Sequence, residues 1–467
     1  MSSQIKQAIE AVDSIFNARS VAVIGASQDP GKMGYMTLNS IIQGGYEGDI
    51  YPINPKADHL LGLRAYPSIS HVPGPIDLIV VVIPAPYVAA VLREAVEKGV
   101  SAAVIISGGF REAGRPDLEE ELHSISKKSG LRICGPNVQG INYVPNKLCA
   151  MFWPLVTAPG PIAIIGQSGT VTASLAEWAE FEGLGISGAV NLGNQVDLCE
   201  SDFLEFFAED EKTRAIALYL EAPKDGKRFQ QTLQRVARKK PVAILKSGRT
   251  AGGQKAAASH TGSLAGIDEV FSGACRQLGV FRADDLEHIF DSVKAIATMP
   301  EPQGNRLLVL TTSGGSAALG IDEAEKRGLS IPPLPAPLVE KLKKAQSIPA
   351  FASFSNPLDF AGVNIENFRE ALPILHQFGV ADIYLLIFGD PVPGGAEAVE
   401  QLASEMSAPL VVSYLGGGAL QRSDSVKMQA AGIPVFSTPD RAARGIAAAV
   451  WNACYRKGKG DISATVY

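Results

Sequence analysis

The sequence predicts an α/β protein with several doubly wound parallel sheets, and three observations support this. The chain has 467 residues, and because domains cluster near about 100 to 200 residues it should contain more than one. Apolar residues make up 46% of the sequence and it contains 47 glycines, a composition typical of well-packed globular proteins. Short aliphatic runs alternate with helical stretches, which indicates parallel sheets buried on both faces. We therefore expect three consecutive α/β domains.

The first domain is expected over residues 10–148. Its strands are predicted from continuous apolar runs separated by helix-like segments, at residues 20–25, 78–83, 102–106 and 132–134. A run of this kind, without polar alternation, is typical of a strand covered on both sides. The first domain should therefore contain a central parallel sheet.

The second and third domains are expected over residues 155–297 and 304–455. Between them, the sequence from Thr298 to Asn305 has the composition of a linker, with two prolines and a glycine. Strands of the second domain are predicted at 161–166, 215–220 and 241–245, and those of the third at 306–311, 383–388 and 409–413.

Composition also excludes several classes of function. The net charge is −6, and without a basic block the chain lacks the field that holds a nucleic-acid backbone. The longest apolar run, residues 78–92, is broken by Pro84 and Pro86, so we expect no membrane span. The five cysteines are scattered singly and the first 16 residues lack the apolar core of a signal peptide, which favours reduced thiols in the cytoplasm.

The first strand ends in a turn of small residues, Gly25, Ala26 and Ser27. Such a turn lets backbone amides at a helix start approach a phosphate group, although the same glycines could serve only tight packing. The turn lacks a strict G-x-G-x-x-G pattern. The next strand is followed by Asn54 and Lys56 rather than by the carboxylate that reads an NAD ribose. Lys56 suits a phosphorylated ligand such as coenzyme A (CoA).

Two further turns resemble each other. The sequences Ser168-Gly169-Thr170 and Ser313-Gly314-Gly315 each follow a predicted strand and precede an alanine-rich helix. Each offers a capping hydroxyl, free amide groups and the positive end of a helix dipole. Two such helix starts facing one point would hold a phosphate, whereas two separate helix caps would not.

His260 and Glu221 are the candidate catalytic residues. His260 lies in a run of Gly, Ala, Ser and basic residues at 246–263 with no apolar period, so we expect an exposed loop. Neutral imidazole is a good nucleophile near neutral pH and can carry a phosphoryl group. Glu221 follows the strand at 215–220 and could orient the imidazole by accepting its ring proton, or it could be an ordinary exposed charge.

The segment from Lys246 through His260 to Gly266 resembles the phosphohistidine loop of the succinyl-CoA synthetase superfamily. Across residues 11–451 the chain is more closely similar to alpha subunits of ADP-forming acetyl-CoA synthetases. The resemblance implies an N-terminal Rossmann-like CoA-binding domain followed by two flavodoxin-like domains of the succinyl-CoA synthetase type. It also implies that His260 is phosphorylated and that Glu221 orients it.

The resemblance implies two sets of binding residues. The CoA contacts are Gly25, Ala26, Ser27, Lys56, Ile83, Pro84, Ser107, Gly108 and Asn137. The phosphate contacts are Ser168, Gly169, Thr170, Ser313, Gly314 and Gly315. The chain departs from the family at Val138 and Gln139, where the family often has Cys and Leu. We expect Gln139 to alter how the thioester end of CoA or the acyl group is seated.

The implied reaction interconverts acyl-CoA, phosphate and ADP with a carboxylic acid, CoA and ATP, through an acyl phosphate and phosphohistidine. No ATP-grasp domain is recognised in this chain, so a separate ATP-grasp beta subunit is expected, in a hetero-oligomer of the α2β2 type. ADP or ATP and Mg²⁺ would bind to that partner, and no metal ligand is assigned here. The alternative is a non-catalytic CoA-binding sensor or scaffold. A nicotinamide-dependent oxidoreductase is set aside because it leaves the second and third domains unexplained.

Overall fold

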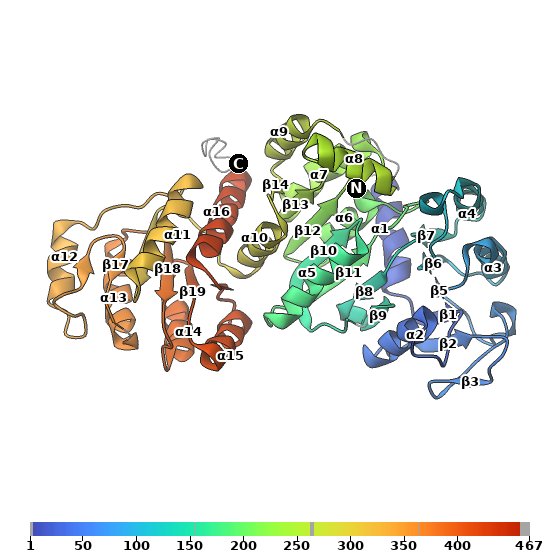
Figure 1. Cartoon of the computed structure of the whole chain (residues 1–467), viewed down its shortest axis with the longest axis horizontal. Helices are drawn as coiled ribbons and strands as arrows, with labels where there is room; N and C mark the ends of the chain where they lie inside the picture. The colour runs from blue at the N-terminus through green and yellow to red at the C-terminus, as the bar shows by residue number, and fades with distance from the viewer. Residues whose placement is uncertain (1–2, 154, 262–265, 363, 458–467) are drawn as a thin grey trace. The chain divides into compact units, whose positions relative to one another are not determined.

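The computed structural model describes residues 3–153, 155–261, 266–362 and 364–457, with only the backbone of residues 257–261. The chain divides into two compact units (Figure 1). The first contains residues 1–180 and 185–278, and the second contains residues 181–184 and 279–467. The first unit holds two sheets and the second unit holds one, so we describe each unit by itself.

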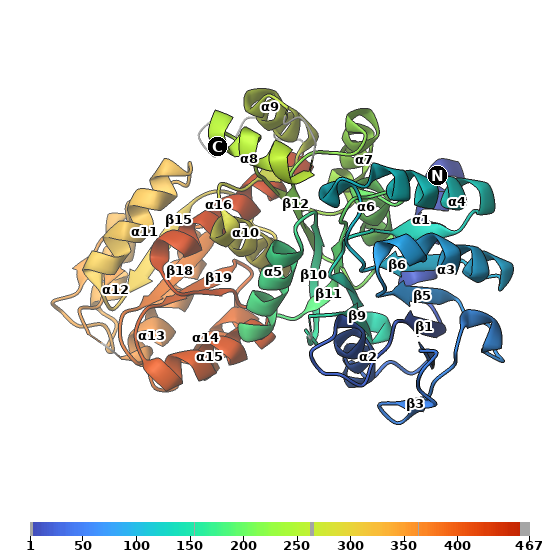
Figure 2. The same ribbon diagram turned by 45° about the vertical axis from the view of Figure 1, so that its right-hand side comes forward.

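The first sheet has five parallel strands in the order β2-β1-β5-β6-β7. The chain passes from β1 to β2 on one side and then returns to β5 on the other, which places a topological switch point at the end of β1. Helices α3 and α4 lie side by side against this sheet (Figure 2). The elements are β1 (Ser20–Ile24), α2 (Met33–Gln43), β2 (Asp49–Ile53), β5 (Leu78–Val81), α3 (Ala85–Glu97), β6 (Ala102–Ile105), α4 (Pro116–Ser129) and β7 (Arg132–Cys134), with a small hairpin of β3 (His59–Leu60) and β4 (Leu63–Arg64).

The second sheet runs β13-β12-β10-β11-β8-β9 within the first unit. Strands β10 to β13 are parallel, whereas β8 and β9 form an antiparallel hairpin that pairs with β11. The elements are β8 (Gly140–Tyr143), β9 (Leu148–Met151), β10 (Pro159–Gly166), α5 (Gly169–Phe181), β11 (Ile186–Asn191), α6 (Glu200–Glu209), β12 (Ala215–Leu220), α7 (Gly226–Lys239), β13 (Val242–Lys246), α8 (Ala251–Thr261) and α9 (Asp268–Leu278).

The first helix, α1 (Ser3–Phe16), packs against α6 of the second sheet. The ring of Phe16 stacks on Tyr143 of β8 with 4.8 Å between ring centroids, and it lies 5.8 Å from Phe203 of α6. Phe16 and Phe203 are fully buried, and each aromatic side chain buries a large apolar area. The chain therefore begins on the second sheet, crosses to the first sheet and returns through β8 and β9.

The third sheet has the order β16-β17-β15-β18-β19-β20, and only the pairing of β16 with β17 is antiparallel. Its core joins apolar side chains of β15 and β18 to those of α13, with Phe368 fully buried. The elements of this unit are β14 (Phe281–Arg282), α10 (Leu286–Thr298), β15 (Leu307–Thr311), α11 (Gly314–Lys326), α12 (Ala336–Lys343), β16 (Ser353–Phe354), β17 (Leu358–Asp359), α13 (Ile365–Phe378), β18 (Ile383–Phe388), α14 (Gly395–Glu405), β19 (Leu410–Tyr414), α15 (Gly418–Ala430), β20 (Val435–Phe436) and α16 (Pro439–Arg456).

Helices α10 and α16 are held together by a buried ion pair. The guanidinium of Arg441 donates two hydrogen bonds, of 2.7 and 2.8 Å, to the fully buried carboxylate of Asp291. Lys294, also fully buried, donates from Nζ to Glu182 Oε2 and to the Val435 carbonyl. Charges buried this deeply require such partners, so losing either arginine or lysine would leave a carboxylate uncompensated.

The predicted fold class is confirmed, because each sheet has a parallel core flanked by helices. Strands β12 and β18 match their predicted ranges to the residue, while the hairpin of β8 and β9 was not anticipated. The three domain boundaries expected from the sequence stay predictions. Within the described ranges, no helix combines the length and apolar character that crossing a membrane requires.

Candidate functional site

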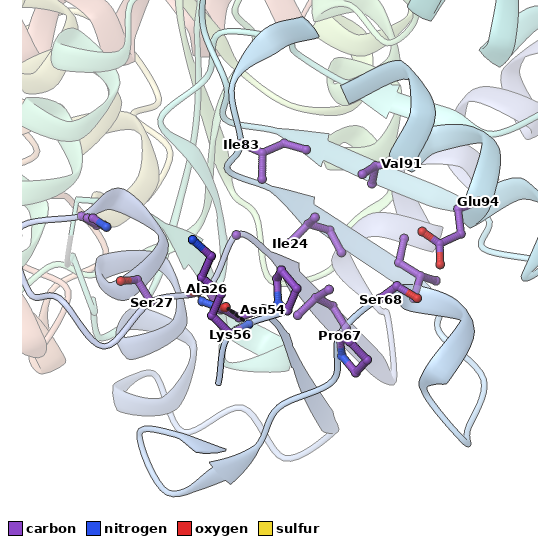
Figure 3. A pocket seen from close by; sticks show the side chains of 15 residues that line it. Ile24, Ala26, Ser27, Asn54, Lys56, Pro67, Ser68, Ile83, Val91 and Glu94 are labelled. Atoms are coloured by element: carbon purple, nitrogen blue, oxygen red, sulfur yellow. Dashed lines mark hydrogen bonds between the residues drawn. The ribbon is translucent and has the colours of Figure 1, made fainter. Parts of the chain in front are cut away.

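A pocket of about 370 Å³ lies at the switch point of the first sheet (Figure 3). Its walls come from the turn after β1, the segment after β2, residues 67–69 and the second half of α3. Five predicted CoA contacts line it, namely Gly25, Ala26, Ser27, Lys56 and Ile83. Four others, Pro84, Ser107, Gly108 and Asn137, are not among its lining residues. The switch point of a doubly wound sheet is where such folds bind ligands.

Two glycines allow α2 to begin directly beside this pocket. Gly25 has φ +86°, and a Cβ atom there would lie 2.5 Å from the Val82 carbonyl oxygen. At Gly34, in the first turn of α2, a Cβ atom would lie 2.0 Å from the Gly25 carbonyl oxygen. Backbone atoms cannot yield to such contacts easily, so both positions require glycine. The close approach brings the amide end of α2 to the pocket, where it favours an anion.

Asn54 connects the two polypeptide segments that carry the pocket's basic end. Its Nδ2 donates to the Ala26 carbonyl at 2.8 Å, and its Oδ1 accepts from the Lys56 amide at 2.8 Å. Lys32, the residue before α2, also lines the pocket. Two lysines beside a helix start form an environment suited to phosphate groups.

Ser107 and Asn137 do not line the pocket, but they stabilise the segment after β5 that does. Ser107 Oγ accepts a hydrogen bond from the Ile83 amide at 3.1 Å, and the Asn137 amide donates to the Ser107 carbonyl at 2.9 Å. The same loop is fixed by Glu112, whose carboxylate accepts from the Gly109 amide at 2.7 Å and from Asn194 Nδ2 at 2.6 Å. Burial alone would raise the pKa of Glu112, but these hydrogen bonds outweigh it and lower the pKa.

The predicted phosphate turn of the second sheet begins α5. Ser168 precedes the helix, and its carbonyl accepts hydrogen bonds from the amide and the hydroxyl of Thr172, at 3.1 and 2.8 Å. Gly169 faces Gln139, because a Cβ atom there would lie 2.6 Å from Gln139 Cγ. Among the residues that the structure describes, Gln139 Oε1 is buried without a hydrogen-bond partner. The family departure at Gln139 therefore lies directly against the start of this helix.

Glu221 is buried, with only 7% of its surface exposed. It is therefore not an ordinary exposed charge, which was the alternative that the sequence left open. The Gln167 side chain holds its backbone, since Oε1 accepts from the amides of Glu221 and Ala222 and Nε2 donates to the Ala222 carbonyl at 2.6 Å. Further along, the Lys224 amide donates to Glu200 Oε1 at 3.2 Å. The loop after β12 is thus fixed at Glu221 itself and at two residues that follow it.

Tyr219 and Ser247 border the same strand ends. Burial raises the pKa of Tyr219, the nearby polar side chain of Ser247 opposes this rise, and the negative charge of Glu221 adds to it. Tyr219 and Glu221 come from the end of β12, and Ser247 follows β13. Sequence reasoning identified only Glu221 in this group, because a tyrosine and a serine at strand ends carry no distinctive pattern.

The expectation of a loop at 251–261 is wrong, because these residues form α8. Thr250 starts the helix, since its Oγ1 accepts from the Gly253 amide at 3.2 Å and its carbonyl accepts from the Gln254 amide at 2.7 Å. The segment contains four alanines, and the high helix propensity of alanine prevails although no apolar face is present. His260 lies in the last turn, but its side chain is outside the described residues, as are Gly262 and Ser263.

The predicted turn of the third sheet, Ser313-Gly314-Gly315, begins α11 in the second unit. A Cβ atom at Gly314 would lie 2.6 Å from Asp359 Oδ2. Ser313 Oγ is 2.9 Å from Ser316 Oγ, so this hydroxyl is engaged within its own turn. The carboxylate of Asp359 at the helix start was not anticipated from the sequence.

Comparison with known proteins agrees with this arrangement. Residues 19–144 match the family model of a CoA binding domain, and residues 159–296 match that of a succinyl-CoA ligase like flavodoxin domain. The alpha subunit of acetate–CoA ligase [ADP-forming] I from Pyrococcus furiosus is 39% identical, covering 94% of this chain and 96% of that protein. The alpha subunit of isoform II from the same organism is 36% identical, covering 92% and 95%.

Solved structures give the same result. A dinucleotide-forming acetyl-coenzyme A synthetase 1 from Ca. Korarchaeum cryptofilum, in complex with phosphate and ADP, has a TM-score of 0.88 at 34% identity and covers 97% of this chain and 99% of that chain. Fold, pocket and matches together define a CoA ligase of the succinyl-CoA synthetase superfamily. More particularly, the chain belongs to the family of alpha subunits of ADP-forming acetate–CoA ligases.

Proposed function

We propose that this chain binds CoA and carries the phosphoryl group in an ADP-forming acyl-CoA ligase. The observation that supports this most is the arrangement of the first unit. A pocket with two lysines lies at the switch point of the first sheet, and a glycine-started helix and the buried Glu221 lie at the carboxyl edge of the second. Ligand binding and group transfer both use such strand ends. The relatives named above are ADP-forming acetate–CoA ligases.

The proposed reaction has three steps. A phosphate oxygen attacks the thioester carbonyl of acyl-CoA, the C–S bond breaks, and CoA leaves as a thiolate that takes up a proton. The imidazole of His260 then attacks the phosphorus of the acyl phosphate, and the carboxylate leaves. Finally, a terminal oxygen of ADP attacks the phosphohistidine, which releases ATP and free imidazole. Each step exchanges one bond for another, so covalent catalysis divides one difficult transfer into easier ones.

We assign the following roles to residues of the second sheet. Ser168, Gly169 and Thr170 hold the phosphate through the hydroxyl and free amides at the start of α5. Glu221 positions His260 by accepting its ring proton, which leaves the other ring nitrogen free to attack. Gln167 and Glu200 keep Glu221 in place through the backbone contacts described above.

The remaining assignments concern the third sheet and a partner. Ser313, Gly314 and Gly315 would contribute a second helix start to the phosphoryl group. ADP and Mg²⁺ would bind to an ATP-grasp beta subunit in an α2β2 assembly in the cytoplasm. The ADP-forming acetate–CoA ligase I from Archaeoglobus fulgidus supports this, because this chain covers only 63% of its length. Such a relative contains additional sequence that a separate subunit could supply.

The test is phosphoryl labelling of His260. The purified chain is incubated with its partner subunit, Mg²⁺ and ATP labelled in the γ-phosphate, and the protein is examined for acid-labile, base-stable phosphate. We expect label on the wild-type chain and none on His260→Ala, with His123→Ala as a control. His123 is an exposed histidine on α4, and its Nδ1 hydrogen-bonds the Val196 carbonyl oxygen. Absence of label in a wild-type chain that binds CoA would favour the sensor or scaffold function.

A further inference from the structure

The pocket of the first sheet has two chemically different ends. Figure 3 shows Ser27 and Lys56 at one end and Glu94 and Ser68 at the other. Between them lie apolar side chains, including Ile24. A ligand that fills this pocket should therefore have an anionic end, a flat or apolar middle and a group that donates hydrogen bonds.

Glu94 is the one acidic residue among those that line the pocket. It projects from α3, and its Oε1 accepts a hydrogen bond from the Ser70 amide at 2.8 Å. Burial would raise the pKa of Glu94, but hydrogen bonds from the Ser70 amide and the hydroxyls of Ser68 and Ser70, with the nearby His71, lower it. Glu94 is therefore an ionised carboxylate at neutral pH, and an ionised carboxylate only accepts hydrogen bonds.

We propose that Glu94, together with Ser68, recognises the exocyclic amine of the CoA adenine; this inference rests on the proposed binding of CoA. With the phosphates at Lys32 and Lys56, the adenine ring would lie across the apolar middle, and its amine would face the carboxylate. An amine offers two N–H donors, whereas a hypoxanthine base presents a carbonyl oxygen at the same position. Two acceptors facing each other repel, and the hydrogen bond that adenine would make is lost. The pocket should thus select adenine nucleotides over 6-oxopurine nucleotides.

Glu94 also has a structural role that the test must separate. Its hydrogen bond to the Ser70 amide fixes the short 3₁₀ segment η1 (Ile69–His71), which supplies another wall of the pocket. The variant Glu94→Gln keeps an oxygen that can accept from Ser70, so η1 should remain in place. The new side-chain NH₂ can donate to a carbonyl, which should weaken the preference for adenine while the hydrogen bond from the Ser70 amide is kept. Glu97→Gln is the matched control, because Glu97 is exposed on the same helix and does not line the pocket.

The experiment measures the Kd of the full-length chain for CoA and for its hypoxanthine analogue by calorimetry. We expect the wild type and Glu97→Gln to bind CoA at least tenfold more tightly than the analogue. We expect Glu94→Gln to reduce this ratio to less than threefold, chiefly through weaker binding of CoA and stronger binding of the analogue.

Three outcomes would overturn the inference. A wild-type chain that binds both ligands equally does not read the exocyclic amine. An unchanged ratio in Glu94→Gln would assign base recognition to another group. Equal weakening of both ligands in Glu94→Gln would mean that Glu94 acts only through η1. Failure of the wild type to bind CoA at all would instead refute the proposed CoA function, so the two proposals fail in distinguishable ways.

Discussion

The second and third sheets place the same local motif in different electrostatic surroundings. In each, a central strand leads through a Ser-Gly turn into a helix, β10 into α5 and β15 into α11. The start of α5 faces the neutral amide of Gln139, whereas the start of α11 faces the carboxylate of Asp359. A carboxylate beside a helix N-terminus neutralises the positive potential that attracts anions. We therefore expect the α5 turn to bind phosphate more strongly, although the two turns have similar sequences.

The strands that pair with β10 and β15 also differ in the residue that follows them. Strand β12 pairs with β10 and is followed by the buried Glu221, while β18 pairs with β15 and is followed by Gly389. A carboxylate at the first of these positions can orient an imidazole, and a glycine at the second cannot. Under the proposed function, we expect the chemistry to take place at the second sheet and the third sheet to have a supporting role.

The largest expected effect tests this assignment at Glu221. We expect Glu221→Gln to slow phosphorylation of the chain by about 1,000-fold, because an amide can neither hold the correct imidazole tautomer nor stabilise imidazolium. Rapid-quench measurement of acid-labile phosphate gives the rate. Glu211→Gln, an exposed substitution before the opposite end of β12, is the control. A wild-type rate in Glu221→Gln would remove the distinction between the two sheets.

A smaller effect is expected at Glu200, which supports the loop of Glu221. Burial raises the pKa of Glu200 to about 7, so the folded chain holds a proton that the unfolded chain releases above pH 4.5. Stability should consequently fall as the pH rises from about 4.5 to 7, by on the order of 3 kcal/mol. Thermal unfolding at pH 5 and pH 7.5 measures this change. Glu200→Gln should be nearly insensitive to pH in this range, and equal slopes in both proteins would contradict the prediction.

The smallest expected effect concerns the two Ser-Gly turns at the starts of α5 and α11. We expect Gly169→Ala to raise the KM for phosphate by about tenfold, roughly 1.4 kcal/mol, because the added methyl group meets Gln139 and shields the amides of α5. Gly314→Ala should raise it by about threefold at most, since that turn already faces Asp359. Gly273→Ala, where a Cβ atom meets open space on α9, is the control. A larger effect at Gly314 would reverse the ranking of the two turns.

The sequence predicted most of the parallel strands well because each of these is a continuous apolar run that only burial on two faces explains. Strand β11 was not predicted because Ser187, Gly188 and Asn191 interrupt that pattern. The first pocket also followed from the sequence, since Gly25 and Lys56 flank a switch point that connectivity determines. The contacts of Gln139 and Asp359 could not be predicted, because they depend on which segments meet in space. Helix α8 was missed because alanine propensity, without an apolar face, was treated as evidence for a loop.

The position of α1 bears on how this protein could be dissected or recombined. Since Phe16 packs on Tyr143 and Phe203, and β8 and β9 extend the second sheet, the first sheet is an insertion within the second rather than an appended module. Truncation at a single point would leave an aromatic cluster unpaired on one fragment or the other. A transplantable CoA-binding module would instead need two cuts, one after α1 and one before β8. The two chain ends left on the second sheet would then have to be joined.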